Sequence, residues 1–340
     1  MRAVVYSQAG DPSVLEVVER EPGEPGRGEV RVRVVVSGVN PTDWKSRAGA
    51  TGQLAFPEIV PNQDGAGVVD AVGPGVDGIA VGDRVWILLA AHGRPTGTAQ
   101  ELTVVPADRV VRLPDTASFD LGAALGVPAV TAHRALTVAE GGPTRLAPGA
   151  LDGKIVLVAG GAGAVGHAAI QLARWAGATV ITTISSPEKA ALATAAGAHH
   201  TVDYTTGDAA DAIRDLAPGG VDIVVEVAPA VNARLNHAVI ANRGTIAVYA
   251  NNGGDSMTLD VRAHFSLNVR YQFLLLYTLA PEAIAAATHD ITAALEAGAL
   301  PVGEEAGLPL VRFPLERTAD AHAAVESGVT GKVLIDVTER

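Results

Sequence analysis

Four glycines between a strand-like run and a helix-like run give this sequence its clearest chemical signal. Residues 160–166 read GGAGAVG, in which Gly161, Gly163 and Gly166 have the GxGxxG spacing. The preceding residues, 155–159, are apolar and largely β-branched, and the following ones repeat apolar side chains at helical spacing. Glycines here allow a tight turn and the close approach of a pyrophosphate, which a helix N-terminus then binds. The stretch predicts a dinucleotide site; the alternative is a glycine-rich turn without a ligand.

The residues after the next strand indicate which dinucleotide binds. An NAD enzyme usually carries Asp or Glu at this strand end, where it binds the ribose 2′-hydroxyl. Here residues 179–184 are followed by Ser185 and Ser186, with Lys189 shortly after. Hydroxyls and a lysine suit a 2′-phosphate instead, so we predict NADPH. The alternatives are that Lys189 is a solvated helix lysine and that Ser186 is only an N-cap.

Strands and helices alternate around this site. The pattern is typical of a parallel, doubly wound sheet, and residues 268–276 are expected to form a further strand at its edge. The expected strands are 155–159, 179–184, 201–203, 221–227 and 245–250, and the expected helices are 163–176, 187–196, 209–216 and 231–241.

The two ends of the chain have a different pattern. Residues 1–125 contain many short strands with glycine turns, which favours a barrel-like β domain. The last part has an alanine-rich helix over 282–297, and then two strands with a helix between them. We therefore predict an α/β protein in which a Rossmann domain, residues 128–277, is inserted into a β-barrel domain made of residues 1–127 and 278–340.

Composition excludes several classes of function. The chain has 340 residues, a net charge of −12 and no cysteine. The charge argues against a nucleic acid as the main partner, and the absence of cysteine removes disulfides, thiolate ligands and a cysteine nucleophile. The longest apolar run, residues 85–91, is too short to span a bilayer, and the first residues do not resemble a secretory signal. We expect a cytoplasmic protein without a membrane partner.

Several long motifs, in order, resemble one known family. They include GEVRVRVVVSGVNPTDW at 28–44, DGAGVVDAVGPGV at 64–76, VGDRVW at 81–86, PAVTAHRAL at 128–136 and a C-terminal TGKVLIDV. The chain resembles the zinc-independent medium-chain dehydrogenase/reductases, the quinone oxidoreductases related to ζ-crystallin. This resemblance implies a GroES-like β-barrel catalytic domain, a Rossmann domain, a cleft between them, and NADPH-dependent reduction of a quinone.

Two amides occupy the places where zinc-dependent relatives have metal ligands. Asn40 and Gln63 stand where those relatives carry a cysteine and a histidine, and neutral amides are poor zinc ligands. We predict no metal and assign Asn40 and Gln63 as catalytic polar groups; the alternative is that both are turn residues. Asp43 is expected to fix a turn or cap a short helix. The substrate-side tyrosine common in the family is absent from residues 47–51.

The resemblance also implies further cofactor contacts and an assembly. The edge strand 268–276 is expected to pair across a two-fold axis, giving a homodimer or a tetramer built from two dimers. Besides Ser185 and Lys189, the cofactor contacts it implies are Thr131, Ala162, Gly163, Ala164, Val165, Tyr204, Ala250, Asn251, Phe273, Leu274 and Leu275.

Three functions agree with these observations. The first is a metal-free NADPH-dependent quinone reductase. The second is a reductase of activated C=C bonds in enals or enones, which the residues do not separate from the first. The third is a non-catalytic NADPH-binding protein, as ζ-crystallins are in lens.

Overall fold

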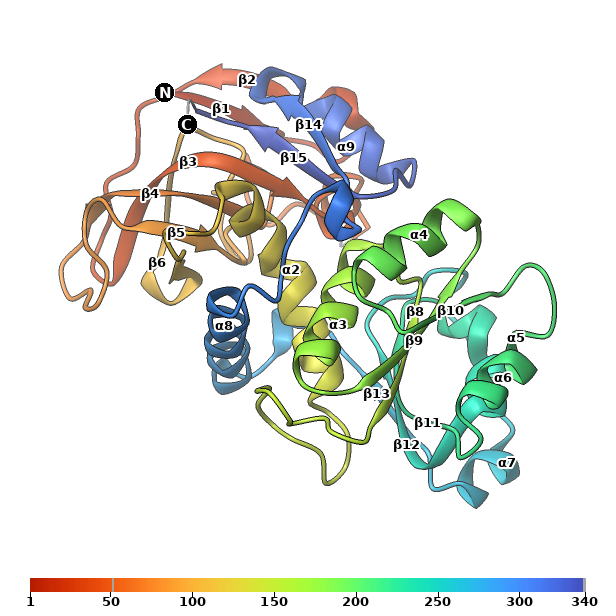
Figure 1. The fold of residues 1–340 in the computed structure, drawn as a ribbon. Coiled ribbons are helices and arrows are strands. Elements are labelled where there is room, and N and C mark those ends of the chain that lie inside the picture. The colour runs from red at the N-terminus through yellow and green to blue at the C-terminus, as the bar shows by residue number, and fades with distance from the viewer. Residues whose placement is uncertain (51, 339–340) are drawn as a thin grey trace. The chain divides into compact units, whose positions relative to one another are not determined.

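The computed structural model describes residues 1–50 and 52–338, and the chain divides into two compact units (Figure 1). Unit 1 comprises Met1–Val127 and Leu310–Arg340, and unit 2 comprises Pro128–Pro309. The insertion of one domain into another is as predicted from the sequence. The second boundary differs, because residues 278–309 belong to unit 2 and not to the β domain.

Unit 1 is built on a seven-stranded sheet in the order β14-β15-β3-β4-β5-β7, with β6 paired to β3, and a separate β1-β2 pair. In the central strand β3, Val30, Val32 and Val34 are fully buried while Arg33 is exposed, because successive side chains of a strand point to opposite faces of the sheet. These valines belong to the core of unit 1. The strands are β1 (Arg2–Val5), β2 (Glu16–Glu19), β3 (Glu29–Val39), β4 (Asp64–Val72), β5 (Arg84–Ile87), β6 (Leu102–Pro106), β7 (Val110–Arg112), β14 (Leu310–Pro314) and β15 (Lys332–Asp336).

Three longer helices accompany these strands. They are α1 (Pro41–Arg47), α9 (Thr318–Glu326) and α2 (Phe119–Leu136), which runs across the division between the units. The sequence pattern did not predict α2, because Gly122, Gly126 and Pro128 lower the helix propensity of this segment. Gly126 has a tertiary reason: a Cβ there would lie 2.0 Å from Oδ1 of Asp64.

Unit 2 contains a six-stranded parallel sheet in the order β10-β9-β8-β11-β12-β13. This is the Rossmann order, and α3 and α4 cover one face while α5 and α6 cover the other (Figure 1). The doubly wound sheet predicted from the sequence is confirmed. Its elements are β8 (Ile155–Ala159), α3 (Ala164–Trp175), β9 (Thr179–Ile184), α4 (Pro187–Ala195), β10 (His200–Asp203), α5 (Ala209–Leu216), β11 (Val221–Glu226), α6 (Pro229–Val239), β12 (Ile240–Val248), α7 (Val261–Ser266), β13 (Arg270–Phe273) and α8 (Pro281–Glu296).

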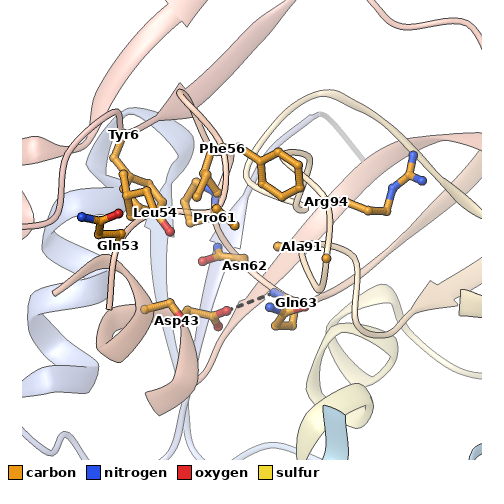
Figure 2. Close-up of a pocket in the computed structure, with 14 residues that line it drawn as sticks. Tyr6, Asp43, Gln53, Leu54, Phe56, Pro61, Asn62, Gln63, Ala91 and Arg94 are labelled. Carbon is orange, nitrogen blue, oxygen red and sulfur yellow. Dashed lines mark hydrogen bonds between the residues drawn. The ribbon is translucent and has the colours of Figure 1, made fainter. Parts of the chain in front are cut away.

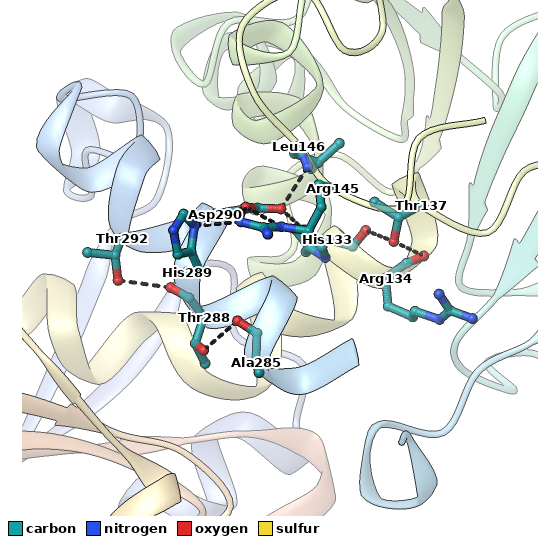
Figure 3. Close-up of polar contacts among 10 residues, drawn as sticks. All are labelled: His133, Arg134, Thr137, Arg145, Leu146, Ala285, Thr288, His289, Asp290 and Thr292. Carbon is teal, nitrogen blue, oxygen red and sulfur yellow. Dashed lines mark hydrogen bonds and ion pairs between the residues drawn. The ribbon is translucent and has the colours of Figure 1, made fainter. Parts of the chain in front are cut away.

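A buried ion-pair network explains why α8 belongs to unit 2. Asp290 of α8 is 2% exposed, and its carboxylate accepts hydrogen bonds from His133 at 2.8 Å, Arg145 at 2.5 Å and the Leu146 N–H at 2.7 Å (Figure 3). These donors all come from residues that follow Pro128. The alanine-rich pattern of residues 282–297 predicted the helix but not its partner, since the partner residues are about 150 positions away.

No helix in the described part of the chain is long and apolar enough to cross a membrane.

Candidate active site

A buried polar network in unit 1 joins three residues that are far apart in the sequence. Asn40, which precedes α1, donates from Nδ2 to Oδ2 of Asp64 at 2.7 Å, and Lys332 donates to Oδ1 of Asn40 at 2.7 Å. Lys332 Nζ also lies 3.7 Å from Asp64. All three side chains are at most 2% exposed. Burial raises the pKa of Asp64 and lowers that of Lys332, and their mutual attraction opposes both shifts.

Asp43 links this network to a pocket. One of its oxygens accepts from the Asn40 N–H at 2.7 Å and the other from the Gln63 N–H at 3.1 Å. The first contact is half of a capping box on α1, which confirms the helix-capping role expected from the sequence. Burial, reinforced by the nearby Asp64 carboxylate, raises the pKa of Asp43 to about 7.

The pocket lies within unit 1 and has a volume of about 240 Å³ (Figure 2). The residues with polar side chains in its wall are Tyr6, Asp43, Ser46, Gln53, Asn62 and Gln63. Arg94 also contributes to the wall, but its guanidinium is paired with Glu29 at 2.7 Å. The apolar lining consists of Leu54, Ala55, Phe56, Ile59, Pro61 and Ala91. A cavity of this size, with both apolar and polar walls, suits a small molecule that carries an apolar ring or chain and a polar group.

The two amides assigned as catalytic have different surroundings. Gln63 lines the pocket, is 8% exposed, and its Oε1 has no hydrogen-bond partner among the described residues. Asn40 does not line the pocket, and its side chain is held from both ends by Asp64 and Lys332. Gln63 therefore lies in the wall of a pocket that a ligand can enter, whereas the Asn40 side chain is hydrogen-bonded to Asp64 and Lys332 outside that pocket.

Tyr6 is a pocket residue that sequence reasoning missed. It follows β1 and exchanges two backbone hydrogen bonds with Ile59, at 3.0 and 2.9 Å. An aromatic residue at a strand end normally packs in the core, so no local signal distinguishes it. Its role as a pocket residue depends on the pairing with residue 59, which the sequence pattern does not report.

In unit 2 the glycine loop has the predicted form. Residues 160–163 connect β8 to α3, and Gly163 is the N-cap of α3. No side chain caps this helix, so its first N–H groups remain available to an anion. Gly166 permits close packing of helix and loop, because a Cβ there would lie 2.4 Å from the Gly160 carbonyl oxygen.

Two of the predicted 2′-phosphate residues contact each other at the end of β9. Nζ of Lys189 donates to Oγ of Ser185 at 3.0 Å. The Tyr204 N–H donates to the carbonyl of Ile184 at 3.1 Å, and the Tyr204 side chain is 53% exposed. Ser186 caps α4 through the Lys189 N–H, as expected. A half-buried lysine, two hydroxyls and a phenol at this strand end form a group that can bind a phosphate.

The remaining predicted cofactor residues follow strand ends or lie on α2. Thr131 is on α2 and 8% exposed. Ala162, Ala164 and Val165 surround the start of α3, and Ala250 and Asn251 follow β12. Asn251 donates to Asp255 at 2.5 Å. Phe273, Leu274 and Leu275 end or follow the edge strand β13.

No group of three or more His, Cys, Asp or Glu side chains that could hold a metal ion occurs in residues 1–50 and 52–338.

Comparison with known proteins agrees with this architecture. The family described as "Alcohol dehydrogenase GroES-like domain" matches residues 26–115, and the family described as "Zinc-binding dehydrogenase" matches residues 164–293. A 2-haloacrylate reductase from Burkholderia is 34% identical over 75% of this chain and 74% of its own. A quinone oxidoreductase from Pseudomonas aeruginosa is 31% identical over 94% of both chains.

Solved structures extend the similarity to the whole fold. A structure described as an NAD-dependent alcohol dehydrogenase has a TM-score of 0.86 at 33% identity and covers 99% of this chain and 100% of its own. A mycobacterial protein solved in complex with NADPH has a TM-score of 0.82 at 29% identity, covering 98% of this chain and 99% of its own. Sequence motifs, domain insertion, sheet order and these similarities lead to one conclusion: the chain belongs to the medium-chain dehydrogenase/reductase family, with quinone oxidoreductases among its relatives.

Proposed function

We propose that this protein is an NADPH-dependent, metal-free reductase of quinones. The observation that carries the proposal is the pocket of unit 1, whose lining combines apolar side chains with two groups that can donate hydrogen bonds, the Gln63 amide nitrogen and the Tyr6 hydroxyl. An electrophilic carbonyl compound needs an apolar surface for its ring and a hydrogen-bond donor for its oxygen, and this pocket contains both.

The chain offers a matching set of groups for NADPH. The pyrophosphate would bind at the uncapped N-terminus of α3, and the 2′-phosphate at Lys189, Ser185 and Tyr204. When bound, NADPH supplies the hydride that reduces the acceptor. The mycobacterial relative solved with NADPH supports NADPH as the cofactor. Another relative of the same family is described as NAD-dependent, which points to the other cofactor. Direct comparison of the two cofactors is therefore part of the test.

A second function has a specific observation in its favour. The Burkholderia relative reduces, by its name, a haloacrylate, which is an activated alkene. Hydride addition to an enone or enal places negative charge on an oxygen just as quinone reduction does, and the pocket suits both. We therefore retain reduction of activated C=C bonds as the alternative.

Three further properties belong to the proposal. Zinc independence rests on the amides at positions 40 and 63, which replace thiolate and imidazole ligands. A homodimer is proposed because the edge strand β13 leaves Phe273 and Leu275 exposed at 61% and 57%. Location in the cytoplasm stays a prediction.

The test is a panel of acceptors followed through nicotinamide absorbance. Purified protein is mixed with NADPH or NADH and with benzoquinone, a naphthoquinone, cyclohex-2-enone, a short enal or 2-chloroacrylate. We expect turnover with NADPH and a single-ring quinone. Turnover with the enone or enal alone would select the alternative, and binding of NADPH without turnover of any acceptor would indicate a non-catalytic protein.

A further inference from the structure

The hydroxyl of Tyr6 occupies an unusual position for a buried phenol. Tyr6 is 4% exposed, and its backbone is held by the two hydrogen bonds to Ile59. The side chain nevertheless lines the pocket, on the side opposite Gln63 and Ala91 in Figure 2. Its position is therefore set by strand-like pairing and not by contacts of the hydroxyl itself.

This hydroxyl has no hydrogen-bond partner among the described residues. Buried phenols normally find one, because burying an unpaired hydroxyl costs free energy. The Oε1 atom of Gln63 on the same pocket is also unpartnered. The Tyr6 hydroxyl differs from that oxygen in not being among the fully buried unpaired atoms, so it is open to the pocket, and a free donor on a pocket wall indicates that its partner is a molecule that enters the pocket.

The charges around the pocket indicate the type of molecule. Arg94 is engaged by Glu29, and Asp43 places a carboxyl group in the wall. Neither feature favours a carboxylate ligand, since the Arg94 cation is already paired with Glu29 and the Asp43 carboxyl group offers an anion no positive charge. A neutral carbonyl compound needs no free cation, and its oxygen can accept a hydrogen bond from the phenol.

We propose that Tyr6 is a catalytic residue that donates a hydrogen bond from its phenol to the carbonyl oxygen of a neutral acceptor bound in this pocket. The inference rests on the proposed function, in which the acceptor takes a hydride from NADPH and a proton from water. As the hydride adds, negative charge develops on the acceptor oxygen, and a donor already aimed at it lowers the barrier.

Tyr6 acts as a hydrogen-bond donor and keeps its own proton. Burial, with the Asp43 carboxyl group nearby, raises the pKa of Tyr6 to about 12. A phenol this weakly acidic stays protonated near neutral pH. It is a weaker acid than a hydroquinone hydroxyl, which resembles an ordinary phenol, so proton transfer from Tyr6 to the hydroquinone anion is unfavourable. Solvent therefore supplies the proton that completes the reaction.

The experiment compares Tyr6→Phe with Tyr271→Phe, a matched loss of one hydroxyl in unit 2, where Tyr271 contacts His264 at 3.2 Å. In Tyr6→Phe we expect kcat for benzoquinone or cyclohex-2-enone to fall about 10- to 100-fold, with KM for NADPH changed less than about two-fold. Tyr271→Phe should match the wild type. Thermal unfolding of both variants checks that each is folded.

A second readout does not need turnover. Calorimetric titration of the cofactor-free protein with cyclohexanone, an unreactive carbonyl probe, should give about 3- to 10-fold weaker binding in Tyr6→Phe, the loss expected for one neutral hydrogen bond. Wild-type kcat and wild-type ketone affinity in Tyr6→Phe would overturn the proposal. If the wild type turns over no acceptor, the proposed function fails, while the ketone titration still decides whether Tyr6 contacts a carbonyl.

Discussion

Nζ of Lys332 donates to Oδ1 of Asn40 at 2.7 Å, although 292 residues separate them. The contact orients the Asn40 amide, because the oxygen must face the ammonium group and the nitrogen must then face Asp64. Asp64 in turn accepts the Val127 N–H with both oxygens, at 2.9 and 3.0 Å. The C-terminal strand β15 thus completes a network whose other members come from the first half of the chain.

Lys332→Met should strongly destabilise the protein. It leaves the buried Asp64 carboxylate without its cation and the Asn40 oxygen without its donor, and breaking a buried pair from one side costs about 3–5 kcal/mol. Urea unfolding of the variant at neutral pH measures this cost.

The double variant Lys332→Met with Asp64→Asn is the control, since it removes the uncompensated charge. It should be more stable than Lys332→Met alone. Equal stability of wild type and Lys332→Met would mean that Asp64 is not charged in the folded protein.

Acid should destabilise the protein partly through His322. This side chain is fully buried and contacts Oδ1 of Asn62 at 2.9 Å, and burial, together with nearby Arg47, lowers its pKa to about 3. The unfolded chain binds a proton near pH 6.5, so the stability contributed by the neutral folded form is present above that pH and is lost as the pH falls toward 3. Between pH 7 and about 4.5 the loss should be about 2–3 kcal/mol.

Unfolding free energies at several pH values in this range measure the effect. His322→Gln should lose less stability on acidification than the wild type. His200→Gln, at an exposed position, should show the same pH dependence of the unfolding free energy as the wild type. An unchanged slope in His322→Gln would contradict the assignment.

Lys189→Ala should discriminate between cofactors. A lysine–phosphate contact in a partly exposed site contributes about 1–2 kcal/mol, so kcat/KM for NADPH should fall about ten-fold while that for NADH barely changes. Lys154→Ala, which removes a lysine paired with Asp222 at 3.0 Å, is the matched control and should affect neither cofactor. Equal losses for NADPH and NADH in Lys189→Ala would show that Lys189 does not contact the 2′-phosphate.

Zinc should be unnecessary for activity. The chain has no cysteine and carries amides at positions 40 and 63. Purified protein should contain no stoichiometric zinc by elemental analysis, and turnover should survive EDTA. Activity lost on chelation and restored by zinc would refute this prediction.

The edge strand β13 should mediate a homodimer. Pairing of two copies would satisfy its free backbone edge and cover Phe273. Light scattering at micromolar concentration should give the dimer mass, and Phe273→Asp should shift the protein toward monomer. Val81→Asp, at a 66% exposed position of unit 1, should not. A monomeric wild type would exclude the proposed pairing.

Local patterns were sufficient to predict the Rossmann unit and its cofactor loop. The run 155–159, the glycines after it and the helical spacing that follows are short-range features that reflect backbone conformation and burial. They correctly predicted the parallel sheet, the glycine loop between β8 and α3, and Ser186 as the N-cap of α4. The hydroxyl and amino groups that follow residues 179–184 in the sequence singled out Ser185 and Lys189, and these two side chains contact each other in the structure.

Only the tertiary structure decided which residues share a site. Tyr6 reaches the pocket of Gln63 because the end of β1 pairs with Ile59, and Lys332 reaches Asn40 because β15 lies beside β3. Similarly, α8 belongs to unit 2 because Asp290 meets His133 and Arg145. Periodicity in a sequence reports which face of an element is buried, but not which distant element covers it, since that choice depends on the packing of the whole chain.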